Sequence, residues 1–197
     1  MFTGIIQTVG RIAEVVPHGE DCALRIEAPS LGMEDVQLGD SIAVNGVCLT
    51  VTDFNSRSFQ VMVSKVTLEV TTGLSQPGPV NLEKAMRLAD RLGGHLVTGH
   101  VDGIGSITAL ESVGECWLLK VRAPHAISKY IAKKGSLCVN GISLTVNEIQ
   151  QDEVSINLIP HTMQHTMMQH AKAGDPVNLE IDVIARYVER MQVWEQE

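Results

Sequence analysis

Short segments in which apolar and polar residues alternate dominate the chain, and Gly, Pro, Asp or Ser separates them. This period of two, with many β-branched residues, is typical of β-strands. Five or six short strands in each half favour a small closed antiparallel barrel, because closure removes exposed sheet edges. The predicted strands span 2–16, 23–28, 41–52, 58–63 and 80–85, then 95–110, 116–122, 136–139, 143–148, 154–159 and 177–181.

The same pattern occurs twice. Ser41–Val51 (SIAVNGVCLTV) returns as Ser136–Val146 (SLCVNGISLTV) after 95 residues, and later matches shift by 97. This period is too long for a solenoid repeat, so it predicts two tandem domains, at 1–94 and 95–182. Each copy carries an Asn-Gly dipeptide between apolar runs, which predicts a tight turn. A duplicated domain offers two similar pockets.

Helices are few in the predicted pattern. Short helices are expected at 67–72, 124–131 and 162–173, and a longer one starts after Asp182 as its N-cap. The C-terminal segment 183–197 lies outside both repeats and carries an apolar stripe at helical spacing: Val183, Ile184, Tyr187, Val188 and Met191. The stripe fits either self-association or packing on the chain's own barrel.

Composition narrows the classes of partner. The net charge of −8 and pI near 5.3 argue against nucleic acid or an anionic membrane. The sequence shows neither a membrane-length apolar run nor a signal peptide, and its four cysteines are dispersed. We therefore expect a cytoplasmic protein with reduced thiols.

A few polar residues are candidates for chemistry. Cys48 and Ser143 occupy equivalent positions after the two Asn-Gly turns, although a cysteine on a strand is more often a small core residue. His95 and His100, five apart on a predicted strand, point to opposite faces. His161 and His165 have the spacing of a helical metal pair, but no carboxylate or cysteine completes a site, which favours a pocket rim and no metal.

Several longer motifs carry a resemblance to a known family. They are the start MFTGII, the segment NGVCLT at 45–50, GGHLVTGHVDG at 93–103, NGISLTV at 140–146 and LIPHT at 158–162. Together with VNLEIDVIARYVER at 177–190, they resemble riboflavin synthase of the alpha-chain type, in order and over almost the whole chain.

The resemblance implies two tandem Greek-key barrels, called lumazine-binding repeats, and a specific reaction. Two molecules of 6,7-dimethyl-8-ribityllumazine are dismutated, and one donates a four-carbon unit to the other. The products are riboflavin and 5-amino-6-(D-ribitylamino)uracil, and neither metal nor cofactor is required. It also implies a homotrimer joined by C-terminal helices, with each active site between two subunits, and an association with lumazine synthase.

The resemblance also assigns site residues by position. The residues expected to take part in proton transfer are Cys48, His100, Ser143 and Asp182. The first barrel's substrate residues are Gly4, Ile5, Ile6, Cys48, Leu49, Thr50, Met62, Val63, Ser64, Lys65, Val66 and Thr67. The second barrel's substrate residues are Gly99, His100, Val101, Lys134, Ser143, Leu144, Thr145, Asn157, Leu158, Ile159, Pro160, His161 and Thr162.

Some positions depart from the family pattern. Val66 stands where relatives carry Glu, the segment 71–79 is about two residues short, and Asn140 replaces a common Asp. These departures leave an alternative: a non-catalytic lumazine- or flavin-binding antenna paralogue. The second-barrel motifs, which tend to decay in such paralogues, are intact here and favour the enzyme.

Overall fold

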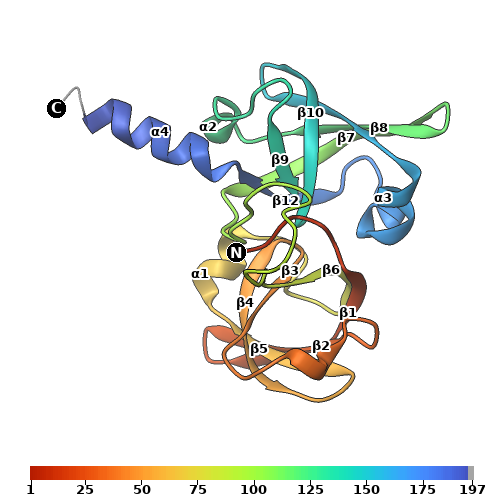
Figure 1. Ribbon diagram of the computed structural model, residues 1–197, viewed down its shortest axis with the longest axis vertical. Helices are drawn as coiled ribbons and strands as arrows, with labels where there is room; N and C mark the ends of the chain where they lie inside the picture. Colours follow the sequence, from red (N-terminus) through yellow and green to blue (C-terminus); the bar gives the residue numbers. More distant parts are fainter. Residues whose placement is uncertain (195–197) are drawn as a thin grey trace.

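Figure 1 shows the computed structural model of the protein, which describes residues 1–194. Two closed β-barrels of six strands each lie one above the other, which confirms the predicted fold class. The N-terminus lies where the two barrels meet, and the C-terminal helix projects away from the second barrel. Residues 195–197 of the predicted segment 183–197 lie outside the described residues.

The two barrels have the same topology. The first has the order β1-β2-β5-β4-β3-β6, and the second has the equivalent order β7-β8-β11-β10-β9-β12. In each, three hairpin-connected strands are followed by one that returns beside the first of them, which is a Greek key. The strands are β1 (Thr8–His18), β2 (Asp21–Glu27), β3 (Ser41–Val44), β4 (Val47–Phe54), β5 (Ser58–Val63), β6 (Gly78–Lys84), β7 (Gly103–Val113), β8 (Cys116–Arg122), β9 (Ser136–Val139), β10 (Ile142–Gln150), β11 (Glu153–Leu158) and β12 (Pro176–Ile181).

The repeat extends to irregular features of the backbone. A register shift between Ile12 and Glu14 recurs between Ile107 and Ala109, at the same 95-residue spacing. Both predicted Asn-Gly turns are confirmed, since Asn45 and Asn140 have φ of 47° and 48° and each following glycine is also left-handed. Alternating strand positions fill a separate apolar core in each barrel.

The helices lie outside the barrel walls. They are α1 (Lys65–Val70), α2 (His125–Ser128), α3 (Pro160–His165) and α4 (Val183–Trp194), with short 3-10 turns η1 (Met33–Asp35) and η2 (Met167–His170). As predicted, Asp182 caps α4, since its carboxylate accepts from the Ile184 N–H at 3.0 Å. In the described part of the chain, none of these helices is long and apolar enough to cross a membrane.

The predicted first strand of each copy is too long at its start. Barrel strands begin at Thr8 and Gly103, not at residues 2 and 95. The preceding segments leave their own barrel and cross to the other one. Ile6 packs on the second core and Val101 packs on the first, while Phe2 and Val97 exchange backbone hydrogen bonds where the segments meet.

The two barrels therefore join through a pseudo-symmetric interface. Asn81 donates its side-chain amide to the carbonyl of Asn140, and Asn178 donates to the carbonyl of Asn45. The two turns also touch: a Cβ added at Gly46 would lie 2.5 Å from the backbone nitrogen of Gly141. Close glycine contacts and buried asparagines thus fix how the two pockets sit relative to each other.

Candidate functional site

The predicted site residues gather at two equivalent places, one on each barrel. Each place combines the start of one strand (β4 or β10), the end of its neighbour (β5 or β11) and the start of a short helix (α1 or α3). The segment that crosses from the other barrel completes it. The Cys48 N–H donates to the carbonyl of Gly99, and the Ser143 N–H donates to the carbonyl of Gly4, both at 2.8 Å.

This exchange corrects the predicted grouping of the crossing segments. Gly4, Ile5 and Ile6 were expected at the first-barrel pocket, but Gly4 contacts Ser143 of the second barrel. Gly99, His100 and Val101 belong instead with Cys48 of the first barrel. The prediction assigned each segment to the barrel that follows it in the sequence. It was wrong because the chain crosses from one barrel to the other before β1 and before β7 begin.

Not every predicted side chain can reach a ligand. Leu49, Val63, Leu144 and Leu158 point into the barrel cores and are at most 7% exposed, so only their backbone groups are available. Cys48 and Ser143 are half-buried at equivalent positions. The exposed side chains at the first pocket are Thr50, Met62, Ser64, Lys65, Val66 and His100, and those at the second are Ile5, Thr145, Asn157, Ile159 and His161.

The short helices start at these pockets for local reasons. Ser64 caps α1 by accepting from the Thr67 N–H at 3.2 Å, and Pro160 opens α3 with a backbone angle suited to the first turn. Val66 on α1 is 69% exposed and corresponds to His161 on α3. The two pocket rims therefore differ at an equivalent position.

His95, which the sequence analysis did not select, contacts a predicted catalytic residue. Its Nδ1 lies 2.6 Å from the Ser143 hydroxyl oxygen. The lack of a side chain at Gly94 allows this approach, because a Cβ there would lie 2.2 Å from the Thr3 carbonyl and 2.6 Å from the Ser143 Cβ. A glycine directly before a histidine, as at Gly94, is the sequence signal that could have indicated this close packing.

The surroundings of His95 keep its imidazole neutral down to a lower pH than that of a free histidine. Burial lowers the pKa of His95, and the negative charge of Asp182 partly opposes this. Within residues 1–194, the buried Nε2 has no hydrogen-bond partner. A buried polar atom without a partner is unusual in proteins and is often found where function requires it. Ser143 and His95 thus form a hydrogen-bonded pair, and Asp182 adds a negative charge that acts on the imidazole.

Two other predicted site residues, His100 and Lys134, make fewer contacts with the rest of the site. His100 is exposed beside the first pocket, and its backbone N–H donates to the Thr98 hydroxyl at 3.3 Å. Lys134 has φ of 66° and donates its N–H to the carbonyl of Val146. Among residues 1–194, no hydrogen bond links the Lys134 side chain to either pocket.

The histidines of α3 stack on each other. The rings of His161 and His165 have centroids 4.2 Å apart, and His165 Nδ1 lies 2.9 Å from the carbonyl of His161. Over residues 1–194, no cluster of three His, Cys, Asp or Glu residues has the geometry of a metal site.

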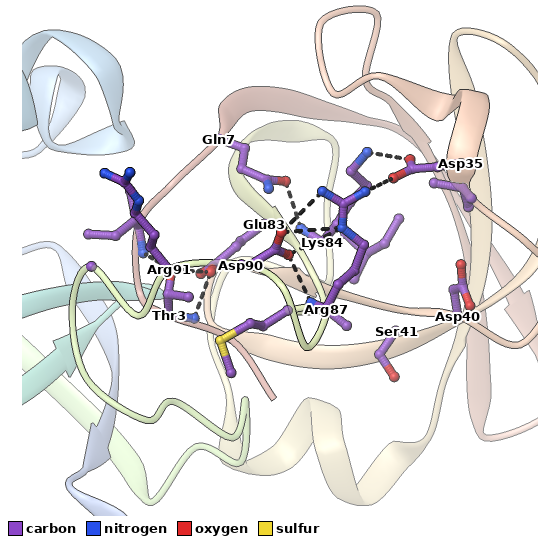
Figure 2. A pocket seen from close by; sticks show the side chains of 16 residues that line it. Thr3, Gln7, Asp35, Asp40, Ser41, Glu83, Lys84, Arg87, Asp90 and Arg91 are labelled. Carbon is purple, nitrogen blue, oxygen red and sulfur yellow. Dashed lines mark hydrogen bonds and ion pairs between the residues drawn. The ribbon is translucent and has the colours of Figure 1, made fainter.

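A cavity of about 630 Å³ lies beside the linker that follows β6, away from most of the predicted positions. Ile5 is the one predicted residue on its wall. Figure 2 shows that its charged groups face one another: Lys84 lies 2.6 Å from Asp35, and Arg87 lies 3.1 Å from Asp90. Four of the charged groups on the cavity wall thus pair with each other, and the two equivalent places around Cys48 and Ser143 remain the better candidates.

Comparison with known proteins matches both halves of this arrangement. The family model described as "Lumazine binding domain" matches residues 3–85 and again residues 98–182. The chain belongs to the lumazine-binding domain family.

Similar proteins within that family narrow the class of protein further. The riboflavin synthase of Photobacterium phosphoreum is 42% identical over 97% of this chain and 88% of the relative. The riboflavin synthase of Bacillus subtilis (strain 168) is 43% identical over 96% of this chain and 89% of the relative. Among solved structures, LumP complexed with riboflavin superposes with a TM-score of 0.82 at 25% identity, over 92% of this chain and 99% of that one.

Proposed function

We propose that this protein is a riboflavin synthase. It converts two molecules of 6,7-dimethyl-8-ribityllumazine into riboflavin and 5-amino-6-(D-ribitylamino)uracil by transfer of a four-carbon unit. The observation that carries this function is the pair of equivalent strand-end sites, at Cys48 and Ser143, each completed by the segment from the other barrel, in a chain more than 40% identical to riboflavin synthases over nearly its full length. A reaction between two identical molecules needs two similar binding sites held in a fixed relation.

The pockets bind the substrate mainly through backbone groups. Strand ends and crossing segments offer N–H and C=O groups that pair with the polar edge of the lumazine ring. The exposed hydroxyls of Thr50 and Ser64 in one pocket, and Thr145 in the other, hold the ribityl chain. Buried leucines beneath the pockets keep these strand ends rigid.

The Ser143–His95 pair moves the proton. The reaction begins with loss of a proton from the acidic C7 methyl group of one bound lumazine. Neutral His95 accepts a proton through the Ser143 hydroxyl, 2.6 Å away, and the carboxylate of Asp182 stabilises the imidazolium that forms. Cys48 and His100 serve the first pocket by positioning its substrate.

The functional unit is a homotrimer in the cytoplasm. Support comes from α4, none of whose residues is buried in the single chain. Ile184, Tyr187 and Met191 each expose more than 60% of their surface along one side of this helix. Contact with other copies covers this stripe and brings the first pocket of one subunit to the second pocket of another. Association with lumazine synthase stays a prediction of the family resemblance.

The decisive experiment mixes the purified protein with 6,7-dimethyl-8-ribityllumazine and follows riboflavin absorbance. Steady formation of riboflavin, with one uracil product for each riboflavin, is expected. Tight binding with strong ligand fluorescence but no turnover would instead identify an antenna protein and overturn the enzymatic function. A Ser143→Ala variant serves as the matched control for contaminating activity.

A further inference from the structure

Two glutamates are buried at the interface between the barrels, and both hold crossing segments. Glu83 lies on β6 of the first barrel and is 3% exposed, and Glu180 lies on β12 of the second and is 2% exposed. Glu83 accepts from the Thr3 N–H, the Thr3 hydroxyl and the Gly4 N–H at 2.7, 2.6 and 3.0 Å. Glu180 accepts the equivalent three bonds from Thr98 and Gly99 at 2.6, 2.6 and 2.8 Å.

These bonds lead into the opposite pocket. Gly4, held by Glu83 of the first barrel, accepts from the Ser143 N–H of the second barrel at 2.8 Å. Gly99, held by Glu180 of the second barrel, accepts from the Cys48 N–H of the first barrel at the same distance. Each glutamate thus binds the glycine whose carbonyl accepts a hydrogen bond from the pocket of the other barrel.

We infer that Glu83 is a positioning residue for the second-barrel pocket and Glu180 is one for the first-barrel pocket. This inference rests on the proposed function, because it assigns roles within the same two substrate sites. The crossed assignment makes each pocket depend on the other barrel, so neither barrel presents a complete site alone.

A carboxylate is the side chain that fits this task. Three donors converge on two oxygens, and an amide would direct its own N–H₂ at one of them. Burial raises the pKa of both carboxyls, and the hydrogen bonds from the crossing segments oppose that rise. The carboxylate and the segment therefore stabilise each other, and loss of one loosens the other.

The test uses isosteric variants and a ligand that is not consumed. Glu83→Gln and Glu180→Gln are each titrated with riboflavin by calorimetry, and amide exchange is followed by NMR in the free proteins. Glu83→Gln is expected to speed exchange of the Ser143 amide about ten-fold or more and leave that of Cys48 unchanged. Glu180→Gln is expected to do the reverse.

Double-mutant cycles assign the affected site. The effect of Glu83→Gln on riboflavin affinity should be non-additive with Ser143→Ala and additive with Cys48→Ala. Thr3→Val and Thr98→Val, which remove one hydroxyl donor and keep the side-chain shape, carry the test if a glutamine variant is insoluble. These milder variants should show the same crossed pattern at smaller amplitude.

Two results would overturn the inference. One is equal acceleration of both amides in each variant, which would show general loosening. The other is an effect confined to the pocket of the glutamate's own barrel. Absence of riboflavin and lumazine binding by the unmodified protein is a separate result, and it would reject the proposed function instead.

Discussion

The two barrels share strand order, bulges and Asn-Gly turns, but they differ in the side chains around their pockets. At equivalent positions, the first barrel has Cys48 and the second has Ser143, and the Ser143 hydroxyl lies 2.6 Å from His95. The rim of the first pocket carries Val66 and Val70 on α1, where the second carries the stacked pair His161 and His165 on α3.

This comparison separates two requirements of the site. The backbone geometry is duplicated, which suits recognition of the same ring twice. The ionisable groups differ between the pockets: the first has Cys48, Lys65 and His100, whereas the second has His95 in contact with Ser143 and His161 at its rim. We therefore interpret the second barrel as the pocket with the proton acceptor and the first as mainly a binding pocket.

The largest effect is expected from removal of α4, an element that the first barrel lacks. A chain ending at Asp182 should become monomeric and lose detectable riboflavin formation, since the apolar stripe would no longer join two pockets. Light scattering and the absorbance assay measure both effects. A chain ending at Trp194 is the control and should stay active. A truncated monomer with full activity would contradict the shared site.

The next effect tests the assignment of chemistry to the second pocket. Ser143→Ala should lower kcat by about 10²-fold or more, the usual contribution of a positioned acid–base group. Cys48→Ala should change kcat less than about ten-fold and act mainly on KM. Cys48→Ser should keep the fold and alter ligand affinity or turnover. Steady-state kinetics with melting curves decides, and equal losses of kcat in both alanine variants would remove the asymmetry.

Substitutions of Gly46 and Gly141 test the contact between the two Asn-Gly turns, a feature common to both barrels. Gly46→Ala should destabilise the protein by about 2–3 kcal/mol, because its Cβ would meet Gly141 and its φ is +80°. Gly141→Ala should cost a similar amount. Gly19→Ala is the control, since its φ is +67° with open space around the new Cβ, and it should cost only about 1 kcal/mol. Urea unfolding measures all three, and equal midpoints would show that the interface relaxes.

The pH dependence should follow His95. Because burial lowers its pKa, the unfolded chain binds a proton before the folded protein does as pH falls below about 6.5. His95 therefore reduces stability as the pH drops through that window, and its contribution is constant above it. The kcat should fall about ten-fold per pH unit below the folded pKa. In a His95→Gln variant this acid limb should disappear, and its persistence would assign the limb to another group.

The smallest effect concerns the rim of the first pocket. The family resemblance implies a glutamate that accepts hydrogen bonds from the ligand at the position that Val66 occupies here. An unpaired ligand donor costs about 1–3 kcal/mol, so the first pocket should bind about ten-fold more weakly than the second. Val66→Glu should recover part of this difference in a riboflavin titration. Val70→Glu, one helical turn further along α1, is the control. Two equal sites in the unmodified protein would show that the departure is neutral.

Most of the local structure can be read from neighbouring residues in the sequence. Period-two alternation placed the strands, the repeated Asn-Gly dipeptides placed the hairpin turns, and Asp182 marked the start of α4. These signals are readable because each depends on neighbouring residues. The duplication then predicted two equivalent pockets, and the motifs at 45–50 and 140–146 predicted the strands on which they are built.

Which segments share a pocket depends on how the two barrels pack against each other. Gly4 joins Ser143, although 139 positions separate them, and His95 joins the same residue across 48 positions. The sequence analysis chose His100 and assigned both crossing segments to their own barrels. The alternation along a strand shows which face of the segment is buried, but it does not show which barrel that face packs against. That choice depends on the close approach of glycines at the interface and on the two buried glutamates that hold the crossing chains.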